Sequence, residues 1–84
     1  MYYVYVLKSR KDHNLYIGST KDLKKRFLMH NLGKVFSTRN RIPFDIIYYE
    51  AYKSENDARH REKNLKLRSR AFTQLKKRII KCIK

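Results

Sequence analysis

The sequence has 84 residues, and its 22 lysines and arginines against 7 acidic residues give a formal net charge of +15. A chain this short buries a thin core, and such a charge indicates a polyanionic partner, either DNA or RNA. The hydrophobic content of 42% excludes a disordered basic tail. A lone cysteine, Cys82, excludes a disulfide framework, and the absence of a long apolar run or a signal peptide predicts a cytoplasmic protein outside the membrane.

The first half of the chain is expected to form a hairpin followed by a helix. Residues 2–8 are rich in β-branched and aromatic side chains and predict a strand, and residues 15–20 predict a second, short strand beyond a polar turn. A helix over 21–32 follows, with Ser19 or Thr20 placed to cap its first turn.

The second half is expected to add one strand and two helices. Pro43 opens a third strand over 44–52, Ser54 caps a second helix, and a third helix spans 69–84. The predicted fold is therefore of the α/β class in the α+β sense. It is a single domain over 1–84, in which a small, mainly antiparallel three-stranded sheet carries flanking helices in the order β-β-α-β-α-α.

The last predicted helix is amphipathic and basic. Its apolar stripe contains Phe72, Leu75, Ile79 and Ile83, and lysines and arginines surround the stripe. We expect the stripe to cover the open side of the sheet. The alternative is a helix that lies on an anionic membrane or docks on a partner protein.

The first helix carries two candidate site residues beside its apolar stripe. At helical spacing, Arg26 and His30 lie one turn apart and next to Leu23 and Phe27, which must face the sheet. An arginine at the edge of a core, with its head in a cleft, suits bidentate recognition of a phosphate. The alternative is that Arg26 pairs with Asp22 and that His30 interacts with the C-terminus of the helix.

The second helix places an acid on its inward face. Glu62 shares that face with Ala58 and Leu65. A carboxylate in a cleft is costly unless it is paired or bound to a metal, and Mg²⁺ takes only one or two carboxylates from a protein. Glu62 is therefore a candidate ligand for one divalent ion, Mg²⁺ or Mn²⁺. The alternative is an ion pair with Arg59 or Arg61.

The chain contains seven tyrosines, and two of them are candidate reactive groups. Tyr5 lies on one strand face with Tyr3. Tyr16 precedes Gly18, where the missing side chain leaves room for another group to approach the backbone. A tyrosine hydroxyl can bind phosphate, position water or act as a base. The alternative for each tyrosine is amphipathic packing in the core.

These residues resemble the GIY-YIG nuclease superfamily, in particular its small, stand-alone, single-domain bacterial members. Tyr3-Val4-Tyr5 stands for the first motif and Tyr16-Ile17-Gly18 for the second, at the spacing that the family requires. Arg26, His30 four residues later, and Glu62 match the remaining motif positions in order. The resemblance covers nearly the whole chain.

The resemblance implies a metal-dependent endonuclease that hydrolyses phosphodiester bonds with one divalent ion, Mg²⁺ or Mn²⁺. It implies that Glu62 holds the metal and that Arg26 contacts the scissile phosphate. Tyr5 would be the general base for the attacking water, with Tyr16 and His30 orienting or assisting it. The substrate is then nucleic acid, DNA rather than RNA. A domain this small predicts low sequence specificity unless a protein partner supplies it.

Two positions depart from the family pattern, because Tyr3 stands where glycine is usual and Val4 replaces isoleucine; we expect an effect on the sheet only. Some members also use an asparagine near the end of the domain, and none follows Asn64. The second interpretation is a non-catalytic DNA- or RNA-binding module on the same scaffold. Both interpretations use the same predicted phosphate contacts, which are Lys24, Lys25, Arg39, Arg41, Arg59, Lys63, Lys66 and Arg68.

Overall fold

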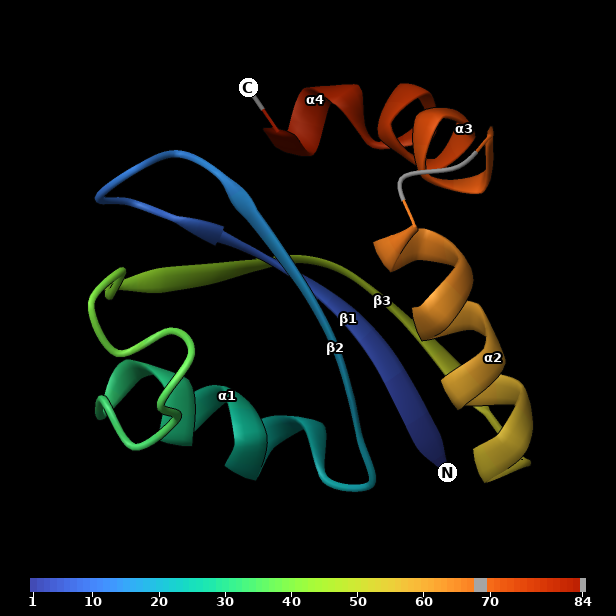
Figure 1. Ribbon diagram of the computed structural model, residues 1–84, viewed down its shortest axis with the longest axis horizontal. Helices are drawn as coiled ribbons and strands as arrows, with labels where there is room; N and C mark the ends of the chain where they lie inside the picture. Colours follow the sequence, from blue (N-terminus) through green and yellow to red (C-terminus); the bar gives the residue numbers. More distant parts are fainter. Residues whose placement is uncertain (68–69, 84) are drawn as a thin grey trace.

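The computed structural model describes residues 1–67 and 70–83, and its centre is an antiparallel three-stranded sheet (Figure 1). The central strand, β1 (Tyr2–Ser9), lies between β2 (Leu15–Thr20) and β3 (Phe44–Tyr52). These strands confirm the predicted sheet, and the predicted hairpin is the β1–β2 pair.

Helices cover both faces of the sheet (Figure 1). One face is covered by α1 (Leu23–Asn31). The opposite face carries α2 (Glu55–Lys66) and α3 (Arg70–Arg78), and a short α4 (Ile80–Ile83) follows. The predicted order and the α+β class are confirmed, with α4 as an addition at the end.

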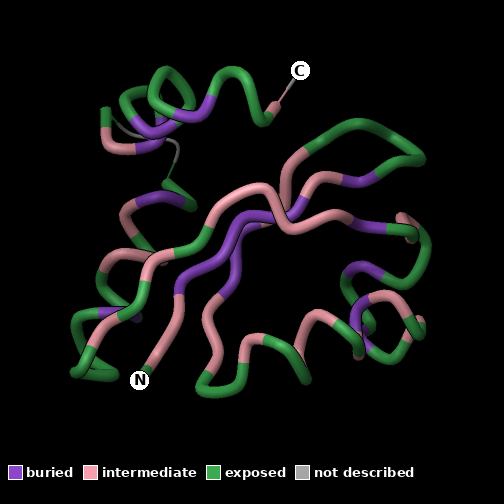
Figure 2. Tube along the Cα trace, turned by 180° about the vertical axis from the view of Figure 1, so that it is seen from behind, coloured by how far each residue is buried: buried purple, intermediate pink, exposed green. Residues whose placement is uncertain are grey.

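Burial on both faces explains the composition of β1. Val4 and Val6 pack into an apolar cluster with α2 and α3, whereas Tyr5 and Leu7 pack on the α1 side with Phe44. Successive side chains of a strand point to opposite faces, so a central strand covered on both sides needs large apolar or aromatic groups at every position. The buried stretch of β1 runs through the middle of the trace in Figure 2.

The start of α1 differs from the prediction. The helix begins at Leu23 and its N-cap is Asp22, whose carboxylate accepts a hydrogen bond of 3.0 Å from the backbone N–H of Lys25. Thr20 uses its hydroxyl to accept from the backbone N–H of Asp22 at 3.1 Å. Several capping residues follow one another here, and Thr20 positions the residue that caps the helix instead of capping it.

The segment between α1 and β3 is anchored at both ends. Gly33 follows the helix with a φ of +74°, a left-handed conformation that favours glycine after a helix. The Asn31 side chain then binds the backbone of Phe44 twice, accepting from its N–H at 2.7 Å and donating to its carbonyl at 3.1 Å. This clamp brings the start of β3 against the end of α1 and so fixes both ends of the intervening loop.

The C-terminal apolar stripe is part of the core. Phe72, Leu75 and Ile79 are buried in the same cluster as Val4 and Val6, so α3 covers the sheet as expected. The single predicted helix over 69–84 is instead divided at Ile79 into α3 and α4, and its predicted ends lie outside the described residues. Within the described part of the chain, no helix has the length and apolar character to cross a membrane.

Candidate active site

Gly18 makes room for the phenol of Tyr5. The two residues are directly opposed in the β1–β2 ladder. A Cβ atom added to Gly18 would lie 2.4 Å from the hydroxyl oxygen of Tyr5, which is closer than any real contact. The Tyr5 side chain therefore lies across β2 at the one position of that strand without a side chain. The space predicted at Gly18 is present, and Tyr5 fills it.

Two residues of α1 hold the Tyr5 hydroxyl. The oxygen lies 2.8 Å from Nε2 of His30, and the guanidinium of Arg26 lies close enough to interact with it as a donor and to lower its pKa. Burial raises the pKa of Tyr5 to about 12, and the interaction with Arg26 opposes this shift without cancelling it. The negative charge of Glu62 is close enough to contribute to the increase. Tyr5 is therefore a neutral phenol at neutral pH, held where added positive charge would favour the phenolate.

His30 is fully buried and bridges two hydroxyl groups. Its Nδ1 lies 2.7 Å from Oγ1 of Thr38, opposite the contact of Nε2 with Tyr5. Burial, and then the charge of Arg26, lower the pKa of His30 to about 4. The ring is uncharged at neutral pH, so it does not act as a cation at the C-terminus of α1. One ring nitrogen donates and the other accepts, and the hydroxyl partners set which is which.

Thr38 is a site residue that the sequence analysis missed. It belongs to the loop between α1 and β3, and its side chain is fully buried. The sequence of this loop is basic and polar. It has no helical or strand periodicity from which a buried hydroxyl at Thr38 could be predicted. Only the closure of this loop over His30 reveals the contact.

Tyr16 completes an aromatic cluster around the imidazole. Its ring packs edge-on against His30 with 5.1 Å between ring centroids, and it lies 6.5 Å from the ring of Tyr5. The alternative of core packing therefore describes the Tyr16 ring well. Because Tyr16 is only half-buried, it also forms the outer side of the cluster.

Glu62 is held from the opposite face of β2. Ser19 donates a hydrogen bond of 2.6 Å to one carboxylate oxygen, and Lys66 forms an ion pair of 2.7 Å with the other. The side chain remains 19% exposed, so a hydrated ion can reach it. Ser19 was also missed by the sequence analysis, because its usual reading near the start of a helix is a cap.

The predicted alternative partners of Glu62 are engaged elsewhere. Arg59 pairs with Glu55 on the same helix at 3.8 Å, and Arg61 pairs with Glu50 of β3 at 2.9 Å. Glu62 therefore has a lysine partner and no arginine partner among the described residues. The ion pair with Lys66 is half-exposed and of low energy, so it leaves the carboxylate available.

The two halves of the site meet at neighbouring positions of β2. Gly18 supports Tyr5 on the α1 face, and Ser19, the next residue, holds Glu62 on the α2 face. Because β2 is an edge strand, a ligand at this edge has access to both faces of the sheet. The structure thus brings Tyr5, Arg26 and His30 into direct contact and places Glu62 across the edge.

The donor set fits one hard divalent ion. The described residues contain no group of three or more His, Cys, Asp or Glu side chains that could enclose a metal. Each oxygen of Glu62 accepts one hydrogen bond and keeps a further lone pair. Mg²⁺ usually keeps several waters and takes one or two carboxylates plus substrate phosphates, so Glu62 alone is an adequate protein ligand.

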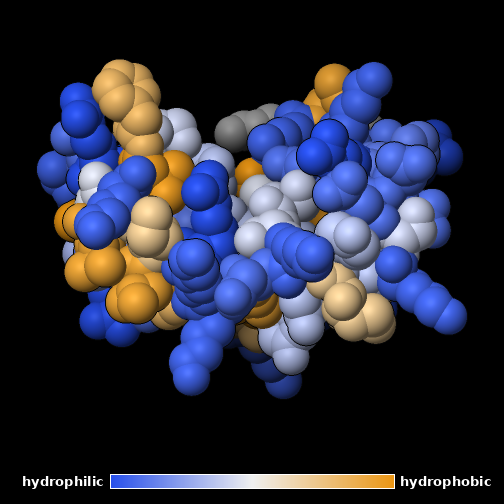
Figure 3. Space-filling model, turned by 90° about the horizontal axis from the view of Figure 1, so that it is seen from below, coloured by the Kyte–Doolittle hydropathy of each residue, from blue (hydrophilic) through white to orange (hydrophobic). Residues whose placement is uncertain are grey.

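The predicted phosphate contacts differ in availability. Lys24, Lys25 and Lys63 are exposed, and the view of the molecule from below shows hydrophilic side chains in the centre and on the right beside a hydrophobic area on the left (Figure 3). Arg41 is half-buried in an ion pair of 2.6 Å with Asp12, which leaves it little freedom to bind phosphate. Three further residues are exposed but already have partners: Arg39 lies over the ring of Phe36, Arg59 pairs with Glu55, and Lys66 pairs with Glu62. Arg68 lies outside the described residues.

The chain belongs to the GIY-YIG catalytic domain family, whose model matches residues 1–78. This family is a nuclease superfamily, and the five motif residues of the chain fall within the matched range. This chain is 45% identical over 67 residues to the UPF0213 protein SpyM50708 of Streptococcus pyogenes serotype M5. The match covers 79% of this chain and 72% of that protein. The UPF0213 protein MGAS10270_Spy1222 of serotype M2 matches equally well.

A solved structure supports the same relationship. The solution NMR structure of the UPF0213 protein BH0048 from Bacillus halodurans has a TM-score of 0.55 and 34% sequence identity to this chain. The match covers 89% of this chain and 81% of that one. The similarity therefore extends over sheet and helices together and is not limited to the motif residues.

Proposed function

We propose that this protein is a metal-dependent endonuclease that hydrolyses phosphodiester bonds, in DNA rather than RNA. One observation carries the proposal. The hydroxyl of Tyr5, beside His30 and Arg26, lies over Gly18 of the edge strand β2, and the next residue of that strand, Ser19, holds Glu62. A cation for the phosphate, a hydroxyl for the water and a carboxylate for a metal are the groups that this hydrolysis requires.

Arg26 and Glu62 would act on the phosphate from the two sides of the β2 edge. The Arg26 guanidinium donates to phosphate oxygens while it remains near Tyr5. Glu62, kept in place by Ser19, would hold one Mg²⁺ or Mn²⁺ ion. When bound, this ion supplies positive charge that neutralises the phosphate and favours ionisation of nearby acidic groups.

Tyr5 would receive the proton of the attacking water. It can do so only as a phenolate, which Arg26 stabilises as a nearby donor. His30 stabilises the same oxygen when its proton is on Nε2, and the Thr38 hydroxyl favours this tautomer by donating to Nδ1. Tyr16 would help to orient the His30 ring by packing against it. The proton moves from water to the phenolate oxygen, and the resulting hydroxide forms a bond to phosphorus. The P–O bond to the leaving sugar oxygen breaks, and this oxygen takes a proton from solvent.

A non-catalytic DNA- or RNA-binding module is the second candidate. The ion pair between Lys66 and Glu62 favours it, because the lysine must give up one carboxylate oxygen before a metal can bind there. The net charge of +15 suits binding without cutting. In either case sequence specificity is low, because this small surface offers few groups to read base edges, and a protein partner would supply target choice.

A cleavage assay tests the proposal. Labelled single-stranded, duplex and branched DNA, and the matching RNAs, are incubated with the protein in Mg²⁺, Mn²⁺ or EDTA. We expect cutting that requires the metal, is lost in Glu62→Ala and persists in Glu55→Ala, an exposed acid of the same helix. Binding without cutting in every metal would overturn the proposal in favour of the binding module, and equal cutting by all variants would identify a contaminant.

A further inference from the structure

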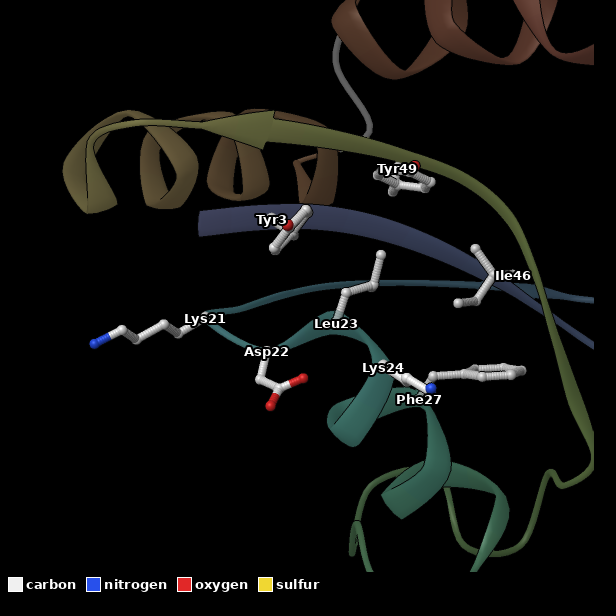
Figure 4. A pocket seen from close by; sticks show the side chains of 8 residues that line it. All are labelled: Tyr3, Lys21, Asp22, Leu23, Lys24, Phe27, Ile46 and Tyr49. Carbon is white, nitrogen blue, oxygen red and sulfur yellow. The ribbon is translucent and has the colours of Figure 1, made fainter. Parts of the chain in front are cut away.

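A pocket of about 690 Å³ opens on the α1 side of the sheet, beside the site described above (Figure 4). The roles proposed for the active site do not use it. Its walls come from β1, β3 and the start of α1, and they are formed mainly by Tyr3, Ile46, Tyr49, Leu23, Lys24 and Phe27.

Two tyrosines form the sheet side of the pocket. The rings of Tyr3 and Tyr49 meet edge-on, with 6.1 Å between their centroids and an angle of 63° between their planes. Tyr49 is 56% exposed, which leaves much of this large side chain in contact with water. A rigid exposed aromatic at the mouth of an apolar pocket is typical of a surface that binds a flat ligand.

The pocket adjoins the reactive phenol. In the sheet, Tyr5 is opposed by Gly18 on one side and by Tyr49 on the other. Because the Tyr5 ring lies over Gly18, it leaves the β3 side to Tyr49. Tyr3 lies two residues earlier on the same face of β1. Neighbouring strands are about 4.8 Å apart, so the aromatic wall begins one side chain away from Tyr5.

Charge indicates the class of ligand. The exposed Lys21 and Lys24 are among the residues that line the pocket, in a chain with a net charge of +15. The pocket also contains the carboxylate of Asp22, but this group caps α1 through the N–H of Lys25. Aromatic faces interleaved with lysines match the way proteins bind single-stranded nucleic acid, where bases stack on rings and cations contact phosphates.

We propose that this pocket holds one unstacked base of the substrate, next to the phosphate at Tyr5, so that the protein selects nucleic acid with unpaired nucleotides. The inference rests on the proposed function. A base inside a duplex has both faces covered by its neighbours and cannot reach the Tyr49 ring without being extruded.

Binding in EDTA tests the pocket separately from cutting. The probe is a short single-stranded DNA with one 2-aminopurine, compared with the same strand in a duplex and with a strand that carries an abasic site. Because Tyr49→Ala removes one stacking partner, we expect it to weaken single-strand binding by about tenfold (1.4 kcal/mol) and to reduce quenching of the probe. Duplex binding, and binding to a strand that is abasic at the stacked position, should not change.

Two further variants are matched to this one. Tyr49→Phe keeps the ring and should restore binding, which excludes a folding defect as the cause. Leu32→Ala removes a 57% exposed apolar side chain outside the pocket and should have no effect. Equal losses on single strand and duplex, an equal loss in Leu32→Ala, or no loss in Tyr49→Ala would overturn the proposal of a base-binding pocket.

The two proposals fail in different ways. If the wild-type protein cuts but Tyr49→Ala binds every probe as the wild type does, the pocket is wrong and the nuclease stands. If nothing is cut in any metal but the base-dependent loss in Tyr49→Ala is observed, the nuclease is wrong. The pocket is then the base-binding part of a single-strand binding module.

Discussion

Two polar clusters of this protein contain the same kinds of side chain and differ in how they are connected. At β3, Glu50 accepts hydrogen bonds of 2.6 Å from both Tyr48 and Tyr52 and a two-point contact from Arg61. Although burial opposes it, these bonds hold the pKa of Glu50 below its usual value. Acid and guanidinium neutralise each other, and the cluster joins β3 to α2.

The candidate active site keeps its acid and its guanidinium apart. Arg26 lies beside the hydroxyl of Tyr5 on one face of the sheet, and Glu62 is held by Ser19 on the other. The arginine keeps donors for an anion, and the acid keeps lone pairs for a cation. The Glu50 cluster thus joins two elements of the fold, and the separation of the other groups supports the proposal that they serve a ligand.

The difference between the two clusters is tested most strongly by neutralising Glu62 and Glu50 in turn. We expect Glu62→Gln to reduce cutting by about 1,000-fold or more, because the lost metal supplies several kcal/mol of transition-state stabilisation. Its free energy of unfolding should change little. Glu50→Gln should instead lower that free energy by about 2 kcal/mol, because Arg61 loses its charged partner, with cutting retained.

Urea denaturation and single-turnover cleavage, applied to both variants, measure the two effects. Loss of cutting in Glu50→Gln at temperatures where it is folded would show that the distinction between the clusters is wrong.

After the loss of Glu62, the next largest effect is expected from Gly18→Ala, which adds a methyl group where β2 contacts Tyr5 of β1. Gly18→Ala places its Cβ where the Tyr5 hydroxyl lies, so the phenol must move away from His30 and Arg26. We expect cutting to fall by about 100-fold, as for loss of a positioned general base. The control is Gly33→Ala, which has open space but a φ of +74°, and should cost about 1 kcal/mol of stability without slowing cutting. A normal rate in Gly18→Ala would contradict the assigned position of Tyr5.

Acid should destabilise the fold through His30. Its pKa is lowered to about 4 in the folded protein from 6.5, so the unfolded chain binds more protons between these values. The free energy of unfolding should therefore decrease as the pH falls from 6.5 to 4, by up to about 3 kcal/mol. Urea denaturation against pH measures this, and His30→Gln should flatten the profile. A wild-type profile that is already flat over this range would show that His30 is not buried as a neutral ring.

The smallest expected effect tests the tautomer of His30. Thr38→Val removes the hydroxyl that contacts Nδ1 but keeps the shape of the side chain. We expect cutting to fall by about tenfold, a typical cost for losing a partner of a ligating or reactive histidine, and Thr38→Ser to restore it. The pH at which the rate reaches half its maximum should shift upward in Thr38→Val, because the phenolate loses support. An unshifted profile would reduce Thr38 to a packing role.

The sequence predicted the sheet well, because its signals are local. Alternating apolar and aromatic residues mark β1, and Pro43 marks the start of β3. The start of α1 was wrong, because Thr20 and Asp22 are both capping residues and only the folded backbone shows which one accepts from the helix. The break at Ile79 was also missed, because the apolar stripe continues through it.

The candidate site shows the same division between local and tertiary signals. Helical spacing was enough to place Arg26 and His30 inward, and the structure brings both to Tyr5. Their chemical roles remain predictions. Ser19 and Thr38 were missed, because each acts through a contact with a distant part of the chain. A lone hydroxyl residue in a loop or on an edge strand gives no sequence pattern for such a contact.

The most direct test of the account is the single-turnover cleavage rate of Tyr5→Phe beside Tyr16→Phe, on whichever substrate the wild type cuts. Both variants keep their rings, so each isolates one hydroxyl. The account predicts that Tyr5→Phe loses about 100-fold or more, as expected for a general base, and that Tyr16→Phe loses at most about tenfold. A Tyr5→Phe variant that cuts at the wild-type rate would contradict the central role assigned to the Tyr5 hydroxyl.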